Sequence, residues 1–385
     1  MQKVLFYTDE FGGNTTTFIY NEVIGLSQYI KVKYVCTKRF NPDIFPFDDV
    51  EIVPYEVNRV VRKLRWWLEI YDVKLIFRNT AFSKRINKIV NEFEPDLIQC
   101  HFGYEALRLV DNLDRTDIPI VVTFQGHDAS YFLKRKSYVD KLKDLFSREN
   151  VYATFVCDFL KRNLEKVGVK FKGEKVIYSG TRLTHFKRRD YDHPKEPFTF
   201  LQVSHFEERK GHKYVLEAFK TVLETKPEKK VKLILAGGGP DLEPMKQLAM
   251  ELGIHEEVDF PGWVSPEQVR ELLENAHAYI LHSLTVDGWT EGIPNAIMEA
   301  MAMELPVIST RHAGIPELVD EGIHGILTDE RDTEALAAGM LDVLTWGYMS
   351  VSREKIIEQF EYQKRIDTLM EYYQKIIGSQ PVLNA

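Results

Sequence analysis

Short apolar runs and amphipathic helical patterns alternate along the whole chain, and this alternation restricts the possible folds more than any other feature. Strands that alternate with helices form β-α-β units, in which the strands are parallel and the helices cover the faces of the sheet. We therefore predict an α/β protein. The expected strands are residues 4–8, 32–36, 96–100, 120–124, 152–156, 175–178, 198–203, 231–236, 278–281 and 305–309.

A polar stretch near the middle of the chain predicts a domain boundary. Residues 187–197 are rich in charges, contain two prolines and resemble an interdomain linker. A chain of 385 residues is long enough for two domains. We expect an N-terminal domain over 1–180 and a C-terminal domain over 195–354. Residues 356–377 show the apolar stripe of one amphipathic helix.

Composition excludes several classes of protein. Hydrophobic residues make up 44% and charged residues 28% of the chain, which is typical of a globular protein with sizeable cores. The three cysteines form no CxxC pair, so we expect a reducing, cytoplasmic setting and no disulfide framework. The first apolar run is too short for a signal peptide, and no apolar run is long enough to span a membrane.

Charge is distributed unevenly along the chain. The formal net charge is −8, but residues 1–180 carry 28 Lys and Arg against 24 Asp and Glu, which gives +4. The rest carries 22 against 34, which gives −12. The basic half favours an anionic partner, and a chance scatter of surface charge explains it equally well. We expect no nucleic-acid partner.

The stretch from His282 to Leu318 is the most informative part of the chain. It reads HSLTVDGWTEGIPNAIMEAMAMELPVISTRHAGIPEL and follows an expected strand. We predict a polar loop that ends at Gly292-Ile293-Pro294, and a helix from Asn295 to residue 303. Pro294 suits the first turn of this helix, because its missing N–H has no helical partner there.

Two glutamates flank the start of this helix. Glu291 is expected in the loop before it, and Glu299 about two turns inside it. The free N–H groups of a helix start attract anions, and carboxylates accept hydrogen bonds from sugar hydroxyls. The pattern therefore suits a sugar nucleotide. Taken alone, a glutamate near a helix start is more often a solvated partner of the helix dipole.

The whole stretch resembles the donor-binding motif of retaining glycosyltransferases of family four, which have the two-domain GT-B fold. The matching positions are Asp287-Gly288, Glu291-Gly292, Pro294, Glu299 to Ala302, Pro306 to Thr310, and Gly314 to Val319. The resemblance is closest to members that build exopolysaccharide and colanic acid. It implies two Rossmann-like domains that face a cleft, with the C-terminal helix (355–385) packing back on the N-terminal domain.

The resemblance also assigns roles to residues in the C-terminal half. It implies that Glu291 holds hydroxyls of the donor sugar and that Glu299 holds the ribose. Lys210 matches a lysine that binds the donor phosphates. His205 replaces the usual arginine of that motif, and Arg209 is a candidate for the missing charge. The backbone of Gly262 and of residues 292–295 is expected to contact the nucleotide.

Two loops of the N-terminal half are expected near the sugar. Gly12 and Gly13 follow the first strand, and glycine allows the backbone to approach a phosphate closely. The segment Gln125-Gly126-His127-Asp128 follows the strand at 120–124. Relatives carry a histidine where this chain has Gln125, and a histidine appears here two residues later. We expect Gln125, His127 or Asp128 to reach the sugar, and His127 taken alone is more often structural.

Residues 59–85 form a basic and aromatic stretch. They contain eight Lys and Arg and the pair Trp66-Trp67. Such a segment suits an interfacial helix on anionic lipid at the inner face of the membrane. The competing interpretation is a surface helix with a solvated basic face. The resemblance implies a sugar or a lipid-linked oligosaccharide as acceptor, which favours membrane contact.

No metal or other cofactor is expected. Asp190-Tyr191-Asp192 has the D-x-D form of metal-dependent transferases, but it lies in the expected linker rather than after a buried strand. We predict a retaining transferase that moves a sugar from a nucleoside diphosphate, most simply UDP, to an acceptor hydroxyl in surface polysaccharide assembly. Two alternatives stay open. One is a sugar phosphorylase or epimerase-like enzyme, and the other is an inactive nucleotide-sugar-binding partner in an assembly complex.

Overall fold

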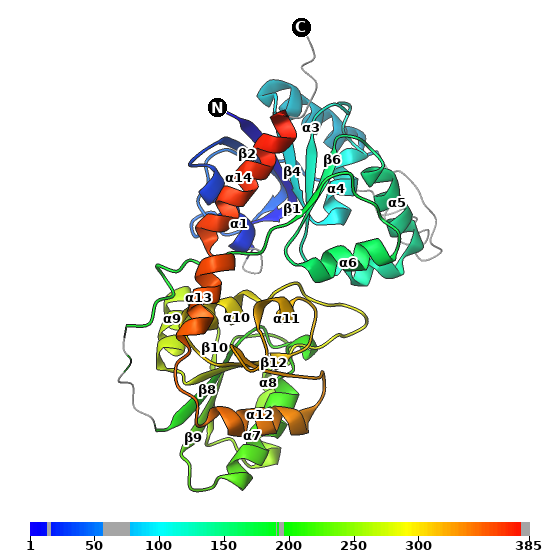
Figure 1. Ribbon diagram of the computed structural model, residues 1–385. Helices are drawn as coiled ribbons and strands as arrows, with labels where there is room; N and C mark the ends of the chain where they lie inside the picture. Colours follow the sequence, from blue (N-terminus) through cyan, green and yellow to red (C-terminus); the bar gives the residue numbers. More distant parts are fainter. Residues whose placement is uncertain (14–16, 57–77, 190, 192–195, 379–385) are drawn as a thin grey trace. The chain divides into compact units, whose positions relative to one another are not determined.

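The computed structural model describes residues 1–13, 17–56, 78–189, 191 and 196–378. The chain divides into two compact units (Figure 1). The N-terminal unit comprises Met1–Tyr178 with Arg365–Ala385, and the C-terminal unit comprises Ser179–Lys364. Each unit contains one parallel sheet, as the alternating pattern predicts.

The N-terminal unit is built on a seven-stranded sheet with the order β3-β2-β1-β4-β5-β6-β7. Its central strands β4 and β5 are buried along their whole length, as continuous apolar runs in parallel sheets are expected to be. The strands are β1 Lys3–Phe11, β2 Lys31–Arg39, β3 Val50–Ile52, β4 Leu97–His101, β5 Ile120–Phe124, β6 Val151–Phe155 and β7 Glu174–Val176. The helices are α1 Thr17–Leu26, α3 Thr80–Phe93, α4 Gly103–Val110, η1 His127–Ala129, η2 Tyr131–Lys134, α5 Lys136–Phe146, α6 Asp158–Lys166 and α14 Tyr362–Gly378.

The C-terminal unit is built on a six-stranded sheet with the order β10-β9-β8-β11-β12-β13. Its strands are β8 Phe198–Val203, β9 Val231–Ala236, β10 Val258–Gly262, β11 Ala278–Leu281, β12 Val307–Thr310 and β13 Gly325–Thr328. Its helices are η3 Glu208–Lys210, α7 His212–Thr225, α8 Leu242–Leu252, α9 Pro266–Asn275, α10 Asn295–Ala302, α11 Ile315–Leu318, α12 Thr333–Val343 and α13 Ser350–Gln359. Residues from β8, β9, β11, α7 and α12 form one apolar core.

The end of the chain differs from the single helix predicted over 356–377. It forms two helices, α13 and α14, with a break at Phe360-Glu361. At the break, the Phe360 carbonyl accepts the N–H of Thr181 at 2.8 Å, and the Thr181 carbonyl accepts the N–H of Tyr362 at 3.1 Å. The prediction of one continuous helix is wrong because these backbone groups pair as in a parallel strand.

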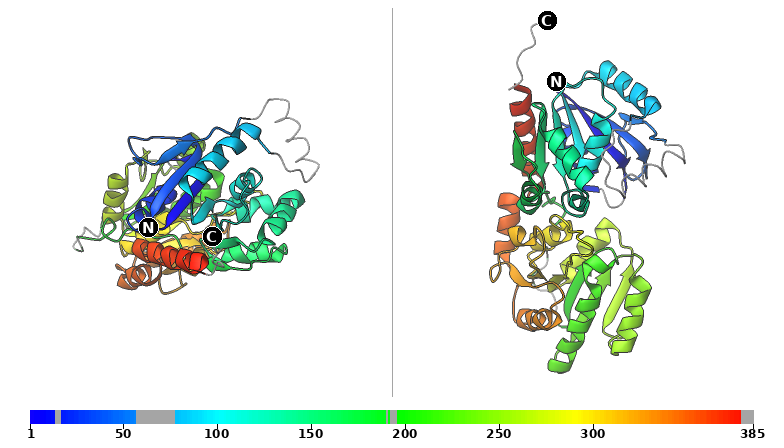
Figure 2. Two further views of the ribbon diagram at one scale, coloured as in Figure 1. Left: turned by 90° about the horizontal axis from the view of Figure 1, so that it is seen from above. Right: turned by 90° about the vertical axis from the view of Figure 1, so that its right-hand side faces the viewer.

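Helix α14 packs against the sheet of the N-terminal unit, although it lies more than 180 residues after β7 in the chain (Figures 1 and 2). The hydroxyl of Tyr373 donates to the side chain of Gln99 on β4 at 2.9 Å. The hydroxyl of Tyr372 lies 3.4 Å from the carbonyl of Ala153 on β6. Helix α13 belongs instead to the C-terminal unit, where it packs on α10.

The predicted linker is partly wrong. Arg188 is buried in the C-terminal unit, and its guanidinium donates to the carbonyls of Met303, Glu274 and Leu273 at 2.8–3.1 Å. It also lies 3.8 Å from the ring centre of Tyr348. These contacts make the segment around Arg188 part of the folded unit. Within the described residues, no helix combines the length and apolar character needed to cross a bilayer.

Candidate functional site

The strand order of the C-terminal sheet changes direction between β8 and β11. Strand β8 continues to β9 on one side, and β11 continues to β12 on the other. Parallel α/β sheets bind ligands outside the carboxyl ends of the strands at such a switch point. The two loops that leave this point are residues 204–211, after β8, and residues 282–294, after β11.

The first loop presents two cations, Arg209 and Lys210, at the end of the short helix η3. Its backbone is fixed, because the side chain of Gln202 donates to the Lys210 carbonyl at 3.0 Å. Gly211 closes the turn with φ of +67°. A Cβ at this position would lie 2.0 Å from the carbonyl oxygen of His282, so only glycine allows the two loops to approach this closely.

The second loop presents Trp289 and Glu291 from a tight turn. Asp287 and Gly288 both have positive φ, at 52° and 76°, and the N–H of Trp289 donates to the Val286 carbonyl at 2.8 Å. Two central residues with positive φ are characteristic of a type I′ turn, for which Asp-Gly is a favoured sequence. The Asp-Gly of the motif therefore has a local structural role, which is to turn Trp289 back along the loop.

Glu291 joins the two loops through charge. Its Oε1 lies 2.5 Å from Nζ of Lys210 and 3.6 Å from the Arg209 guanidinium. Arg209 also pairs with Glu207 at 2.7 Å and lies 4.1 Å from the ring centre of Trp289. Burial raises the pKa of Glu291, but the charges of Lys210 and Arg209 and the hydrogen bond from Lys210 outweigh it and lower the pKa below its usual value.

A second carboxylate, that of Glu330, stabilises the loop after β11 through hydrogen bonds. Oε1 of Glu330 accepts from Nδ1 of the buried His312 at 2.7 Å, and Oε2 accepts the N–H of Thr285 at 2.8 Å. The Glu291 N–H approaches the other ring nitrogen of His312 at 3.4 Å. Burial raises the pKa of Glu330. The hydrogen bonds from His312 and Thr285 lower it by more than burial raises it, so the pKa falls to about 2. Sequence reasoning missed His312 and Glu330.

Glu299 differs from Glu291 in its surroundings. It lies half-buried in the middle of α10, and no donor among the described residues reaches its carboxylate. Burial alone raises its pKa to about 7. The start of α10, at Pro294 and Asn295, has no side-chain cap, so its first N–H groups are open to an anion. Pro294 is the N-cap residue, just before the first turn in which it was predicted.

The predicted residues His205 and Gly262 lie on the β9 side of the switch point. The ring of His205 lies 5.8 Å from that of Trp263, an indole that is 68% exposed. Gly238 makes room for this indole, since a Cβ there would lie 2.2 Å from its ring nitrogen. Gly262, at the end of β10, accepts the N–H of Gly237 at 2.8 Å. Gly292 and Ile293 are buried before α10.

Gly12, in the N-terminal unit, is required for the close packing of its loop against another loop of the same unit. Its φ is +80°, and a Cβ would lie 2.2 Å from the carbonyl oxygen of Phe40. The side chain of Asn41 also donates to the Gly12 carbonyl at 3.1 Å. Glycine at this position therefore allows the backbone of Gly12 to lie close to the loop after β2. Gly13 is the last described residue before residue 17.

The structure of the loop after β5 distinguishes between Gln125, His127 and Asp128, the three candidates for contact with the sugar. The Asp128 carboxylate is buried and accepts the N–H groups of Gly103, Gln125 and Gly126 at 2.9–3.1 Å, so it is taken up within the loop. The side chain of Gln125 and the ring of His127 remain half-buried.

Gln125 is held by a buried chain of polar groups that sequence reasoning missed. Its amide nitrogen lies 2.9 Å from Nδ1 of His101, whose Nε2 lies 3.2 Å from Oε1 of Glu22. The other oxygen of Glu22 accepts from Arg365 of α14 at 3.0 Å. Burial raises the pKa of Glu22, but the charges of Arg365 and His101 lower it to about 2. No sequence spacing connects these residues.

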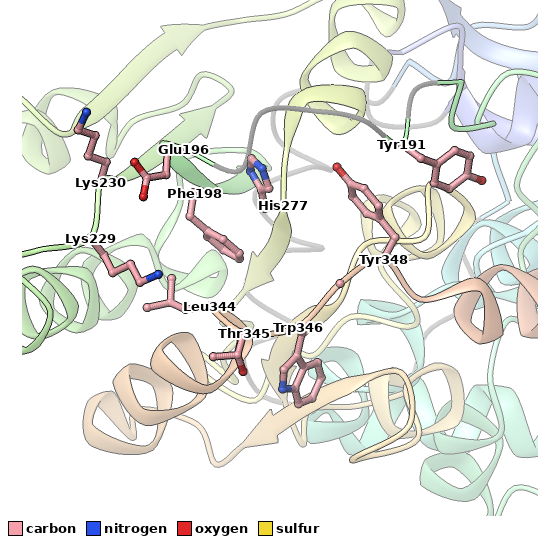
Figure 3. Close-up of a pocket in the computed structure, with 11 residues that line it drawn as sticks. Tyr191, Glu196, Phe198, Lys229, Lys230, His277, Leu344, Thr345, Trp346 and Tyr348 are labelled. Atoms are coloured by element: carbon pink, nitrogen blue, oxygen red, sulfur yellow. The ribbon is translucent and has the colours of Figure 1, made fainter.

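A cavity of about 500 Å³ lies elsewhere in the C-terminal unit, at the amino end of β8 (Figure 3). This is the sheet edge opposite the carboxyl ends that carry Lys210 and Glu291. Aromatic side chains from β8 and from the segment after α12 surround it. Its lining is Tyr191, Glu196, Phe198, Lys229, Lys230, His277, Leu344, Thr345, Trp346, Gly347 and Tyr348.

Two predictions fall on residues that the structure does not describe. Residues 57–77, which are most of the basic stretch 59–85, lie outside the described ranges, as do Asp190 and Asp192. Membrane contact through 59–85 therefore stays a prediction. Tyr191 is described, and its hydroxyl donates to Glu304 at 2.9 Å.

Residues 184–361 match the family model described as glycosyl transferases group 1. The chain is 30% identical to a putative colanic acid biosynthesis glycosyltransferase, WcaL, of Escherichia coli, over 68% of this chain and 64% of that protein. It is 31% identical to an amylovoran biosynthesis glycosyltransferase, AmsK, of Erwinia amylovora, over 65% of this chain and 61% of that protein. These matches thus span less than two thirds of either relative.

Solved structures of low identity share the fold. A glycosyltransferase from Rickettsia africae superimposes with a TM-score of 0.77 at 16% identity, over 98% of this chain and 99% of that one. HepE of Anabaena, solved in complex with UDP and glucose, superimposes with a TM-score of 0.73 at 16% identity, over 97% and 100%. At this identity the likeness establishes two parallel-sheet Rossmann-like domains of the GT-B type.

Proposed function

We propose that this protein is a retaining glycosyltransferase, because residues 184–361 match the family model described as glycosyl transferases group 1. It moves a hexose from a nucleoside diphosphate, most simply UDP, to an acceptor hydroxyl during assembly of bacterial exopolysaccharide or surface polysaccharide. The names of its relatives, which concern colanic acid and amylovoran biosynthesis, support the polysaccharide. The UDP bound to a neighbour of the same fold supports the choice of nucleotide.

One observation carries this proposal: Lys210 and Arg209 meet Glu291 beside the uncapped start of α10, at the switch point between β8 and β11. A departing nucleoside diphosphate develops negative charge, which fixed cations and N–H donors stabilise without reorganisation. Lys210, Arg209 and the first N–H groups of α10 supply both kinds of group. The leaving diphosphate is therefore the ligand that best suits them.

Glu291 has two roles in this proposal. In the structure its carboxylate is the anion that Lys210 and Arg209 contact. A diphosphate gives these cations a second anion, which releases the oxygens of Glu291 to accept hydrogen bonds from hydroxyls of the transferred sugar. The support of the loop by Glu330 and His312 keeps Glu291 in place during this exchange.

Other residues complete the donor site in our proposal. Glu299 accepts the ribose hydroxyls, since no donor among the described residues occupies its two oxygens. His205 and the backbone of Gly262 contact the nucleotide on the β9 side. Gly12 and Gly13 approach the diphosphate, and Gln125 and His127 approach the sugar. The proposal requires no metal, because cations and N–H groups meet the charge of the diphosphate.

Calorimetric titration of the purified protein with UDP, GDP and ADP in EDTA tests the donor site. We expect one nucleotide to bind, and we expect Lys210→Ala to weaken that binding strongly. Lys213→Ala is the matched control, because Lys213 lies on α7 in the same unit and is 59% exposed. Unchanged binding in Lys210→Ala, or binding only after metal is added, contradicts the proposal.

A further inference from the structure

The cavity of about 500 Å³ in the C-terminal unit takes no part in the proposed transfer (Figure 3). It lies where three parallel strands begin, because Phe198 is the first residue of β8, and Lys230 and His277 directly precede β9 and β11. Lys210 and Glu291 follow the carboxyl ends of β8 and β11, at the opposite edge of the same sheet. Small-molecule sites have volumes of about 300–1,000 Å³. The cavity is therefore a second candidate site, separate from the donor site.

Two stacked rings form a rigid part of the cavity lining. The ring centres of Phe198 and His277 lie 5.0 Å apart, with an angle of 28° between the ring planes. Nδ1 of His277 accepts the N–H of Thr199 at 3.0 Å, and the His277 N–H donates to the Thr199 carbonyl at 2.9 Å. These hydrogen bonds fix both the ring and the backbone of His277. Since Nδ1 is an acceptor, the ring hydrogen is on Nε2 and the imidazole carries no positive charge.

A second part of the lining is the segment 344–348, which follows α12. It contributes the half-buried ring of Trp346. Its end is anchored, because the N–H of Met349 donates to the Glu304 carbonyl at 2.8 Å. A Cβ on Gly347 would meet no atom within 4 Å, so the segment adjoins open space. The cavity thus combines rings from anchored segments with room for a ligand.

The charges of the lining favour an anionic ligand. The lining contains the amines of Lys229 and Lys230 and one carboxylate, that of Glu196. Both lysines are exposed, and no carboxylate among the described residues forms an ion pair with either amine. Cations that lack a protein carboxylate attract an anion. The carboxylate of Glu196 is an acceptor for hydroxyl groups of the same ligand.

We propose that this cavity binds a pyranose that carries a negative charge. One face of a pyranose presents C–H groups, which are attracted by the negative face of an aromatic ring such as that of Phe198 or Trp346. The phosphate or carboxylate of the sugar pairs with Lys229 and Lys230, and its hydroxyls donate to Glu196. A free sugar phosphate and an acidic sugar unit of a polysaccharide share this chemistry. The proposal does not rest on the transferase function, because the lining contains no residue of the donor site.

Calorimetric titration of the full chain tests the proposal, with saturating UDP present so that the donor site is occupied. The probes are glucose 1-phosphate, glucose 6-phosphate and methyl glucuronide. The control ligands are methyl glucoside, which has no charge, and inorganic phosphate, which has no ring. We expect at least one charged pyranose to bind about tenfold more tightly than either control ligand. Binding of the sugar phosphates alone indicates a free metabolite as the ligand, and binding of the glucuronide indicates a unit of an acidic polysaccharide.

Variants of the lining assign this binding to the cavity. The double variant Lys229→Gln and Lys230→Gln should weaken it about tenfold, as loss of a charged hydrogen-bond donor does. Lys226→Gln is the matched control, because Lys226 is an exposed lysine of the same segment outside the lining. An unchanged melting temperature of the lysine variants excludes unfolding as the cause. Trp346→Leu should also weaken binding about tenfold, and Trp346→Phe, which keeps a ring, should restore most of it.

The outcomes for the cavity and for the donor site are distinguishable. The cavity proposal fails if no charged pyranose binds, if inorganic phosphate binds equally tightly, or if the double lysine variant binds like the wild type. Loss of sugar-phosphate binding in Lys210→Ala would assign that binding to the donor site instead. If UDP does not bind, but a charged pyranose binds and the double variant loses it, the transferase proposal fails and the cavity proposal holds.

Discussion

The two parallel sheets have switch points of the same topology but of opposite chemistry. In the C-terminal unit, the loops after β8 and β11 meet through charges, with Lys210 and Arg209 against Glu291. In the N-terminal unit, the loops after β4 and β5 meet through rings, with Phe102 against His127. The fold provides the position in both, and side chains decide what binds there.

The two units also place their buried ionic groups differently. In the N-terminal unit, the ion pair of Glu22 and Arg365 is deeply buried and supports Gln125 through His101. In the C-terminal unit, Glu291 and Lys210 are partly exposed, at 19% and 14%. A buried pair mainly maintains structure, because removing one partner leaves a charge in the interior. A partly exposed pair can exchange partners with a ligand.

The largest effect is expected for Arg365→Ala. It leaves the Glu22 carboxylate buried without its cation and removes the donors to the carbonyls of Ile177 and Tyr178. Breaking such a pair costs about 3–5 kcal/mol. Urea unfolding, followed by hydrogen exchange of peptides from β4 and β5, should show the loss. Lys364→Ala, at the exposed neighbouring position, is the control.

This variant also tests whether the units are separate. Amide protection should fall in the N-terminal unit and stay nearly unchanged in peptides from β11 and α10. An equal loss of amide protection in both units would mean that they unfold together. The ion pairs of the two units could then not be treated as stabilising their own units independently.

The second largest effect is expected for Lys210→Ala, and it concerns the turnover number kcat. Removing one group that stabilises developing negative charge typically lowers kcat by about 10²–10³. Initial rates with the nucleotide sugar that binds, measured at saturating acceptor, give the change. Lys210→Arg should recover part of the rate because it keeps the charge, while Lys213→Ala should match the wild type. A normal kcat in Lys210→Ala would place the charged site outside the reaction.

The sequence predicted the architecture and the position of Glu291 before a helix, but it did not predict the contact of Glu291 with Lys210. Alternating strands and helices fix the parallel sheets, and the motif from Asp287 to Glu299 places Glu291 just before a helix. The supporting groups were not predictable in the same way. His312 and Glu330 meet only because β12 and β13 are neighbours, and Glu22 and Arg365 are 343 positions apart. Contacts of this kind leave no periodic or local signal.

Charge also misled the interpretation of single residues. The chain around Arg188 is rich in charges and therefore resembles a linker, yet the guanidinium is buried against three carbonyls. Asp128 resembled a sugar-binding residue because it follows a strand end, yet three backbone N–H groups occupy its carboxylate. In both cases hydrogen bonds to the backbone compensate burial, and sequence alone does not show backbone partners.

A smaller effect is expected for Glu330→Gln, and it should depend on pH. The folded-state pKa of Glu330 is about 2, below the value of an unfolded glutamate, so its charged form stabilises the fold above the unfolded pKa. Because the side chain is 23% exposed, we expect a loss of about 2 kcal/mol at pH 7. The difference from the wild type should shrink as the pH falls from about 4.5 towards 2.

Urea unfolding at a series of pH values measures this difference. Glu334→Gln is the control, because Glu334 is an exposed residue at the start of α12. A difference that stays constant down to pH 2 would mean that the carboxylate charge contributes nothing, and that the loop carrying Glu291 is held by other contacts.

The smallest effect is expected at Glu299, whose pKa is shifted in the opposite direction to that of Glu330. Burial raises the pKa of Glu299 to about 7, so it loses its proton near neutral pH in the folded protein. The charged form accepts two hydrogen bonds from ribose hydroxyls more strongly than the neutral acid does. A hydrogen bond to a charged acceptor exceeds a neutral one by about 1 kcal/mol, which is about fivefold in affinity.

We therefore expect the affinity for UDP-glucose to rise about threefold from pH 6 to pH 8, with calorimetry as the measurement, since this range covers most but not all of the titration. A sugar nucleotide is preferable to UDP here, because its diphosphate diester does not titrate in this range. Glu299→Gln should bind with the same affinity at both pH values, since its amide does not titrate. A wild type that shows no rise, or a rise that persists in Glu299→Gln, would remove Glu299 from the nucleotide site. The charged switch point would then consist of Lys210, Arg209 and Glu291 alone, and the contrast with the rings of Phe102 and His127 would rest on those three residues.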